Sequence, residues 1–258
     1  MEDGIENLVF IGKKDPLKYA LEGLNVLKNR NRRIFVFSEN KGDEGLRLEE
    51  SVKAANNFGL KDSYWWHGKE SYDLLGCLDI SQDLDVMTPD NTVVMSASTR
   101  KIFDARTIER FPYMFNFHHG DLRKLRGSNI HYWAIMNGEK EFIVILHKIA
   151  EKLDSGRVVF EDVFGLDEYD TTQSIYDRSN LSIARLSSRF FEKLENEGMA
   201  KILTDSYSVP LGRNYKRKDC RVEEQDIDMN LPVKDILKQV RALYFPDYRK
   251  TIVIKEKR

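Results

Sequence analysis

The sequence predicts an α/β fold, in which a mostly parallel sheet is flanked by helices and followed by a small C-terminal helix/strand extension. Two observations support this prediction. Short apolar runs that are typical of buried strands alternate with stretches whose apolar residues recur at helical spacing. The composition is that of a globular protein, because 41% of the 258 residues are hydrophobic and 32% are charged. A chain of this length accommodates one large domain, with or without a small extension.

The first half of the chain contains strand and helix patterns in alternation. Residues 8–12 (LVFIG) are typical of a buried strand that ends in a turn at Gly12. Asp15 and Pro16 then suit the capping position and the first turn of a helix. Such alternation produces parallel strands joined by helices. The elements expected next are a strand at residues 33–38, a helix at 49–58, a strand at 91–97, a helix at 103–110 and a strand ending near 117.

The second half of the chain is dominated by a long helical pattern at residues 170–197, which ends before Gly198. A strand at residues 142–149 precedes it. After it, the sequence predicts a polar loop at 207–221, a helix that follows Pro232 and a short strand at 251–254. We therefore expect a main domain over residues 1–200 and an extension over residues 201–258.

The charge and the cysteines exclude several functional classes. The net charge is −1, whereas general nucleic-acid binders usually carry a basic excess. The two cysteines, Cys77 and Cys220, provide neither a disulfide framework nor the spacing of a zinc site, so no metal is expected. Near the N-terminus, no apolar run is long enough for a signal peptide or a membrane span. We therefore expect a cytoplasmic protein that binds neither nucleic acid nor a membrane.

Three polar residues stand out near the middle of the chain. Asn116 and His118 lie at the end of an apolar run, residues 111–117, and residues two apart on a strand project from the same face. Asp154 follows the next apolar run, in a turn-like Asp-Ser-Gly. Each residue taken singly could be structural. Together, a carboxylate, an imidazole and an amide at strand ends predict an acyl-transfer site.

Seven short motifs follow one another through this region: Asn116-Phe117-His118, Gly120-Asp121-Leu122, Arg126-Gly127, Trp133-Ala134-Ile135, Asn137-Gly138-Glu139, His147 and Asp154-Ser155-Gly156. In order and spacing they resemble the catalytic core of the folate-dependent formyltransferases, which include methionyl-tRNA, glycinamide ribonucleotide and sugar-nucleotide enzymes. The loop at residues 122–127 lacks the Pro and Tyr that the family usually carries. The resemblance implies a Rossmann-like sheet and a formyltransferase catalytic domain over residues 1–200.

The resemblance also implies N10-formyltetrahydrofolate as the formyl donor, without a metal. Asn116 is then expected to stabilise the oxyanion, and His118 to act as base or as a second oxyanion donor. Asp154 is expected to orient His118 and to relay protons. The family holds folate mainly through backbone groups. By position, the folate contacts expected in this chain are Thr99, Arg100, Lys101, Ile102 and Leu153.

The acceptor implied by the resemblance is the amine of a nucleotide-linked amino-dideoxy sugar, with dTDP-4-amino-4,6-dideoxyglucose for O-antigen and lipopolysaccharide biosynthesis as the expected case. The tRNA-directed branch carries an added C-terminal barrel, for which we expect no room in 258 residues. The purine-pathway branch lacks the combination of Arg-Gly, Trp-Ala-Ile and Arg-Ala-Leu. A nucleotide sugar presents a pyrophosphate and a base, which cations and aromatic rings can bind. The expected substrate contacts are Arg126, Tyr215, Lys216, Arg217 and Phe245.

Two alternative functions stay open at this point. One is another folate-dependent enzyme of the family, either tRNA-directed or a formyl-folate hydrolase. The other is a folate-binding or interaction protein without catalysis, against which the three intact polar residues argue.

Apolar residues crowd the C-terminal part, among them Leu237, Val240 and Leu243, and exceed what a small extension buries alone. We therefore expect a homodimer, with residues 201–258 serving both sugar-nucleotide binding and dimerisation.

Overall fold

The computed structural model describes residues 4–28, 32–38, 63–67, 87–99, 102–220, 227–246 and 254–255. The helix expected at residues 49–58 lies outside the described residues, as do Arg100, Lys101 and Cys77. Of the strand expected at residues 251–254, only its last residue is described.

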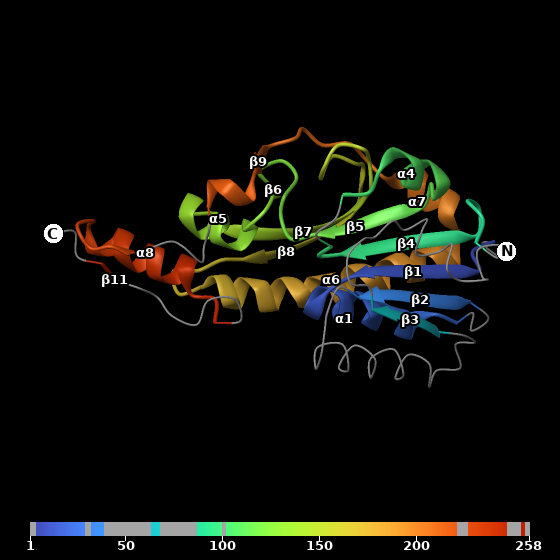
Figure 1. The fold of residues 1–258 in the computed structure, drawn as a ribbon, viewed down its shortest axis with the longest axis horizontal. Helices are drawn as coiled ribbons and strands as arrows, with labels where there is room; N and C mark the ends of the chain where they lie inside the picture. The colour runs from blue at the N-terminus through green and yellow to red at the C-terminus, as the bar shows by residue number, and fades with distance from the viewer. Residues whose placement is uncertain are drawn as a thin grey trace. The chain divides into compact units, whose positions relative to one another are not determined.

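The described strands of the main sheet number seven, in the order β3-β2-β1-β4-β5-β7-β8 (Figure 1). The pairs β1–β2, β1–β4, β2–β3 and β4–β5 are parallel, and the pair β5–β7 is antiparallel. The predicted mostly parallel α/β sheet is therefore confirmed. The strands are β1 (Asn7–Gly12), β2 (Arg33–Ser38), β3 (Ser63–His67), β4 (Thr92–Ala97), β5 (Met114–His118), β7 (Glu141–Lys148) and β8 (Val158–Gly165).

Each helix that the sequence predicts within the described residues is present in the structure. The long helix begins at Thr172 rather than at 170, because residues 170 and 171 form its cap. Four short strands outside the main sheet form two pairs: β6 (Leu125–Gly127) with β9 (Arg213–Tyr215), and β10 (Ile227–Asp228) with β11 (Ile254–Lys255). The described helices are α1 (Lys14–Glu22), α4 (Ala105–Arg110), α5 (Ile130–Asn137), α6 (Thr172–Glu197), α7 (Met199–Asp205) and α8 (Val233–Leu243), with 3-10 turns η1 (Gly23–Val26) and η3 (Arg217–Asp219).

The chain forms two compact units. Unit 1 comprises Met1–His118, Ile145–Glu161 and Ile183–Ser208, and unit 2 comprises His119–Val144, Asp162–Ser182 and Val209–Arg258. The units interleave along the chain because β7, β8 and α6 each cross from one to the other. The functional division at residue 200 stays a prediction.

Both faces of the unit 1 sheet are covered by apolar side chains. On one face, Phe10 and Phe115 pack against Phe191 and Phe190 of α6, with ring centroids 6.1 and 4.9 Å apart. In Figure 1, α1 and α6 lie along the strands β1, β2 and β4. Because side chains alternate along a strand, the neighbouring residues face the other way. That second face holds a buried cluster, made up of Val9, Ile11, Phe35, Phe37, Met87, Val94, Phe111 and Met114.

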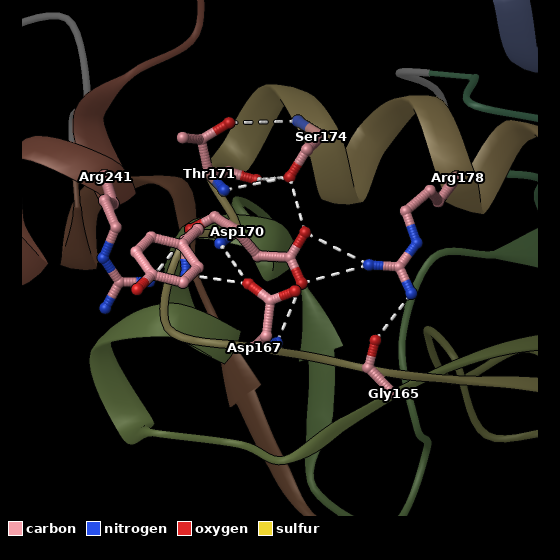
Figure 2. A network of polar contacts seen from close by, with 8 residues as sticks. Gly165, Asp167, Asp170, Thr171, Ser174, Arg178 and Arg241 are labelled. Carbon is pink, nitrogen blue, oxygen red and sulfur yellow. Dashed lines mark hydrogen bonds and ion pairs between the residues drawn. The ribbon is translucent and has the colours of Figure 1, made fainter.

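In unit 2, the start of α6 is held by a polar network (Figure 2). Thr171 and Ser174 form reciprocal side-chain to backbone hydrogen bonds, 2.9 and 3.1 Å long, in the manner of a capping box. The Asp170 carboxylate accepts from the Ser174 hydroxyl at 2.7 Å, and its two oxygens both accept from Nη1 of Arg178, at 3.0 and 3.1 Å. Arg241 of α8 donates to the Asp170 carbonyl at 2.9 Å. The network therefore joins the end of α8 to the start of α6.

Asp170→Ala is expected to lower the free energy of unfolding by about 2–3 kcal/mol, because its donors lose a charged acceptor. Burial raises the pKa of Asp170, but hydrogen bonds from the Asp167 backbone, Ser174 and Arg178 outweigh it and lower that pKa overall. The stabilisation is thus present above the unfolded pKa, about 4, and is lost as pH falls through the lower folded pKa. Urea unfolding of wild type, Asp170→Ala and the isosteric control Asp170→Asn, at about pH 7 and about pH 3, measures this. An equal difference at both pH values would contradict the prediction.

Candidate active site

Asn116 and His118 lie on β5, at the carboxyl end of a strand inside the sheet. They project from the face opposite Phe115, because side chains alternate along a strand. Across the neighbouring strands, Asn116 stands in register with Ser96 of β4 and with His147 of β7. Sites in α/β sheets form beyond the carboxyl ends of parallel strands, and β4 and β5 end here.

Asp154 is placed by the tight connection between β7 and β8. The backbone N–H of Lys148 donates to the Arg157 carbonyl at 2.8 Å and closes this loop. Within it, Asp154 adopts a left-handed backbone with φ of 47°, which Asp tolerates better than most residues. Gly156 packs against the backbone of Lys148, so closely that a Cβ on it would lie 1.7 Å from the Lys148 carbonyl oxygen. The loop path that delivers Asp154 therefore requires glycine at 156.

The Asp154 carboxylate lies between two imidazoles. Its Oδ2 is 3.7 Å from Nδ1 of His118, and its Oδ1 is 3.8 Å from Nε2 of His147. These distances exceed a direct hydrogen bond but permit strong electrostatic coupling. His118, Asp154 and His147 are only 6%, 8% and 2% exposed, so little solvent screens the carboxylate from the rings. Asp154 is therefore placed to stabilise a positive charge on His118 when a reaction delivers a proton there.

His147 is the fourth polar residue of the cluster. Its Nδ1 lies 2.8 Å from the Lys148 carbonyl, and its Nε2 lies 3.2 Å from Nδ2 of Asn116. Burial lowers the pKa of His147 to about 4, and the neighbouring His118 adds to this, whereas Asp154 and the Lys148 carbonyl oppose it. His147 is therefore a neutral imidazole near neutral pH. The sequence places His147 among the family motifs but assigns no role to it. Its register opposite Asn116 depends on the antiparallel β5–β7 pairing, which the sequence alone does not reveal.

The expected folate contacts lie near the ends of β4 and the Asp154 loop. Thr99 follows β4 and is half-buried, after Ser98 in a left-handed conformation with φ of 60°. Ile102 is 71% exposed and Leu153 is 42% exposed. Single exposed apolar side chains are common on protein surfaces, so this exposure is compatible with a contact to an apolar ring but does not indicate one. Arg100 and Lys101 lie outside the described residues.

The expected sugar-nucleotide contacts all belong to unit 2. Arg126 is buried and its Nε donates to the Gly212 carbonyl at 3.2 Å. The Tyr215 ring is also buried, stacks on Trp133 at 4.5 Å, and its hydroxyl accepts from Asn137 at 2.9 Å. Phe245 packs against Tyr176 at 5.2 Å. These three side chains have structural contacts, whereas the main exposed candidates are Lys216 and Arg217.

The described residues include neither a metal-binding cluster nor a helix that could span a membrane. No group of three or more His, Cys, Asp or Glu side chains among them is arranged to hold a metal ion. No helix in the described part of the chain is long and apolar enough to cross a membrane.

Comparison with known families decides which family the chain belongs to. The sequence model of a family described as formyl transferase matches residues 6–183, which include Asn116, His118, His147 and Asp154. The chain belongs to the formyl transferase family. The family expected from the sequence is therefore confirmed, and the match covers both segments that build the cluster.

Among curated formyl transferases, a methionyl-tRNA formyltransferase of Ureaplasma parvum is 27% identical over 169 residues, which are 64% of this chain and 52% of that protein. A bifunctional polymyxin resistance protein ArnA of Wigglesworthia glossinidia brevipalpis is 27% identical over 63% of this chain and 24% of its own length. This formyl transferase chain thus spans about half, or less, of the length of these relatives.

Solved structures share the fold of this formyl transferase. An N-formyltransferase of Helicobacter canadensis, in complex with folinic acid and dTDP-3-aminofucose, superposes with a TM-score of 0.66 at 19% identity, over 95% of this chain and 82% of that one. A glycinamide ribonucleotide transformylase of Symbiobacterium toebii has a TM-score of 0.56 at 16% identity, over 73% of this chain and 89% of that one. At these identities the likeness concerns the fold alone.

Proposed function

We propose that this formyl transferase moves a formyl group from N10-formyltetrahydrofolate to the amine of a nucleotide-linked amino sugar. The observation that carries the proposal is the cluster of half-buried Asn116 with buried His118 and Asp154 at the carboxyl ends of β4 and β5, within the region that matches the family. Such a cluster combines an amide donor, an imidazole and a carboxylate, which are the groups that acyl transfer to an amine requires.

Each residue has a defined task in this reaction. The amine nitrogen forms a bond to the formyl carbon, and the oxygen takes up negative charge that an Asn116 N–H stabilises. His118 accepts the amine proton or donates to the oxyanion. Asp154, 3.7 Å from His118, stabilises the resulting imidazolium. When the bond to the folate nitrogen breaks, that nitrogen takes up the proton that the amine lost. His118 returns it where His118 was the base, and water at Asp154 relays it where His118 donates to the oxyanion, so the cluster ends the cycle in its starting protonation state.

The choice of an amino sugar rests on how much of the chain has a counterpart. An N-formyltransferase from Helicobacter canadensis, solved with dTDP-3-aminofucose, and a sugar N-formyltransferase from Shewanella cover 95% and 92% of this chain. The glycinamide ribonucleotide enzymes from Symbiobacterium toebii and Anaplasma phagocytophilum cover 73% and 74%. This difference supports the assignment of residues 201–258 to sugar-nucleotide binding. The similar structures include one solved with a 3-amino sugar and one described as a 4-N formyltransferase, so acceptors of both kinds are to be tested. The first is dTDP-4-amino-4,6-dideoxyglucose, the acceptor expected from the sequence.

We also propose that the protein is a homodimer that pairs through the extension. Val233 and Leu237 stand four residues apart on α8, and both are largely exposed. Tyr244 follows the same helix and is exposed too. Burying such a stripe in a partner would be favourable. Sedimentation that finds a concentration-independent monomer of 30.2 kDa would count against the dimer.

The proposed activity is tested by offering N10-formyltetrahydrofolate with one acceptor at a time and following the acceptor's mass. The acceptors are dTDP-linked 4-amino and 3-amino sugars, their UDP and GDP counterparts, glycinamide ribonucleotide and charged initiator tRNA. We expect the mass of a dTDP-linked amino sugar to increase by one formyl group. Formylation of the tRNA or of the ribonucleotide alone would contradict the proposed acceptor, while leaving the chain a formyl transferase.

A further inference from the structure

A row of polar side chains crosses three neighbouring strands of unit 1. Ser96 of β4, Asn116 of β5 and His147 of β7 stand in register, and residues in register project from the same face. Within this row, Nδ2 of Asn116 lies 3.2 Å from Nε2 of His147. The notable feature is that the oxyanion donor contacts a histidine that has no step of its own in the reaction above.

The hydrogen-bond partners of His147 determine which nitrogen atoms of this contact carry protons. The Lys148 carbonyl only accepts, so Nδ1 of His147, 2.8 Å away, carries a proton. A neutral imidazole has a single N–H, so Nε2 is unprotonated and accepts. The partner of Nε2 must then donate, and Asn116 can do so only with its NH₂ group. The orientation of the Asn116 amide is therefore fixed by proton counting, whichever way amide oxygen and nitrogen are assigned in coordinates.

This assignment of protons requires a neutral His147 imidazole, and the surroundings of the ring favour the neutral form. The side chain is 2% exposed, and burial lowers its pKa to about 4. Two titratable groups face it: His118, which opposes a positive charge, and Asp154, which favours one. Burial outweighs Asp154. Near neutral pH the acceptor at Nε2 therefore persists.

We propose that His147 is a positioning residue for formyl transfer, whose unprotonated Nε2 holds the Asn116 amide so that its second N–H serves the oxyanion. An Asn amide has two N–H groups, and the contact with Nε2 uses one of them. The reversed amide would turn its oxygen toward the same space and repel an oxyanion. The expected effect on catalysis rests on the proposed formyl transfer. The protonation state of His147 and the orientation of the Asn116 amide do not depend on it.

The test compares two substitutions at residue 147. His147→Leu keeps an apolar side chain of moderate size but removes the acceptor, and kcat is expected to fall about 100-fold, as when an oxyanion donor is lost. His147→Gln places an amide oxygen at the ε position, and is expected to retain kcat within about 10-fold of wild type, because the acceptor is restored. Ser96→Ala is the matched control: it lies in the same row, and its hydroxyl makes no hydrogen bond to the described residues. We expect wild-type kcat there.

A double-substitution cycle separates positioning from general support. If His147 acts through Asn116, then adding His147→Leu to Asn116→Ala costs no further activity, although each change alone is costly. Losses that multiply, or equal losses in His147→Leu and His147→Gln with intact thermal unfolding, would overturn the proposal.

Nitrogen NMR of labelled histidine tests the proton count without any assay. We expect His147 to show a protonated Nδ1 and an unprotonated Nε2 throughout the range from about pH 5.5 to about pH 8. A protonated Nε2 would overturn the proposal even if formyl transfer is confirmed. An inactive wild type with the expected spectrum would instead count against the proposed function alone.

Discussion

Asp154→Asn is expected to reduce formyl transfer by about 100- to 10,000-fold while the affinity for folate stays nearly unchanged, and His118→Ala is expected to do the same. The carboxylate lies 3.7 and 3.8 Å from two buried imidazoles, so its charge is the main nearby stabiliser of an imidazolium. Asparagine keeps the shape but removes that charge. Folate affinity should persist, because the expected folate contacts are mainly backbone groups of other residues.

The measurement is kcat under saturating substrates, with folate affinity determined in parallel by calorimetry. Glu151→Gln provides a matched control, since it removes one acidic charge from the same loop at an exposed position. We expect the control to behave like wild type. Turnover within about threefold of wild type in either Asp154→Asn or His118→Ala would remove that residue from the proposed chemistry.

Gly156→Ala is expected to impair the active site, although Gly156 is not one of the proposed catalytic residues. The added Cβ would lie 1.7 Å from the oxygen and 2.7 Å from the carbon of the Lys148 carbonyl, and these are backbone atoms that a rotamer change cannot clear. The same carbonyl accepts from Nδ1 of His147, so its displacement disturbs His147 and the Asp154 loop together. We expect a loss of about 1–3 kcal/mol in the free energy of unfolding, as in overpacked cores. Activity should fall by about 100-fold, because small misplacements of catalytic groups are costly.

Gly165→Ala is the control for this substitution. Gly165 lies at the end of β8, and a Cβ there would meet nothing within 4 Å. Thermal unfolding and kcat measured on both variants distinguish a local clash from a general effect of replacing glycine. Wild-type stability and activity in Gly156→Ala would show that the loop adapts, and would contradict the tight path described for it.

Five strands of the main sheet and the long helix were predictable because their signals are local, whereas the strands β3 and β8 were not expected. The apolar run of β4 and the Asp-Thr start of α6 each have a periodic or capping pattern that the sequence displays. The strands β6 and β9 have three residues each, too few for a pattern, and they form because their pairing is available in the folded chain. Tyr215 of β9, assigned from sequence to a polar loop, is buried for the same reason.

The sequence identified Asn116, His118 and Asp154 as candidate site residues but did not give their arrangement. Asn116 and His118 share a strand, so their common face follows from the spacing of two. The place of His147 opposite Asn116 depends on the antiparallel register of β5 with β7, which is a long-range property. The left-handed backbone of Asp154 likewise depends on the contact of Gly156 with Lys148. The positions of His147 and Asp154 therefore depend on tertiary contacts, which local sequence patterns do not reveal.

The fate of an isotopically labelled formyl carbon tests the central claim most directly. The protein is mixed with N10-formyltetrahydrofolate labelled at this carbon and with dTDP-4-amino-4,6-dideoxyglucose, and NMR follows the label through a single turnover. If the protein transfers the group to the amine, the label leaves the folate and appears as a formamide on the sugar, and it stays on the folate in Asp154→Asn over the same time. Recovery of the label as formate, with no labelled sugar, would contradict transfer to an amine and indicate hydrolysis of the formyl-folate instead.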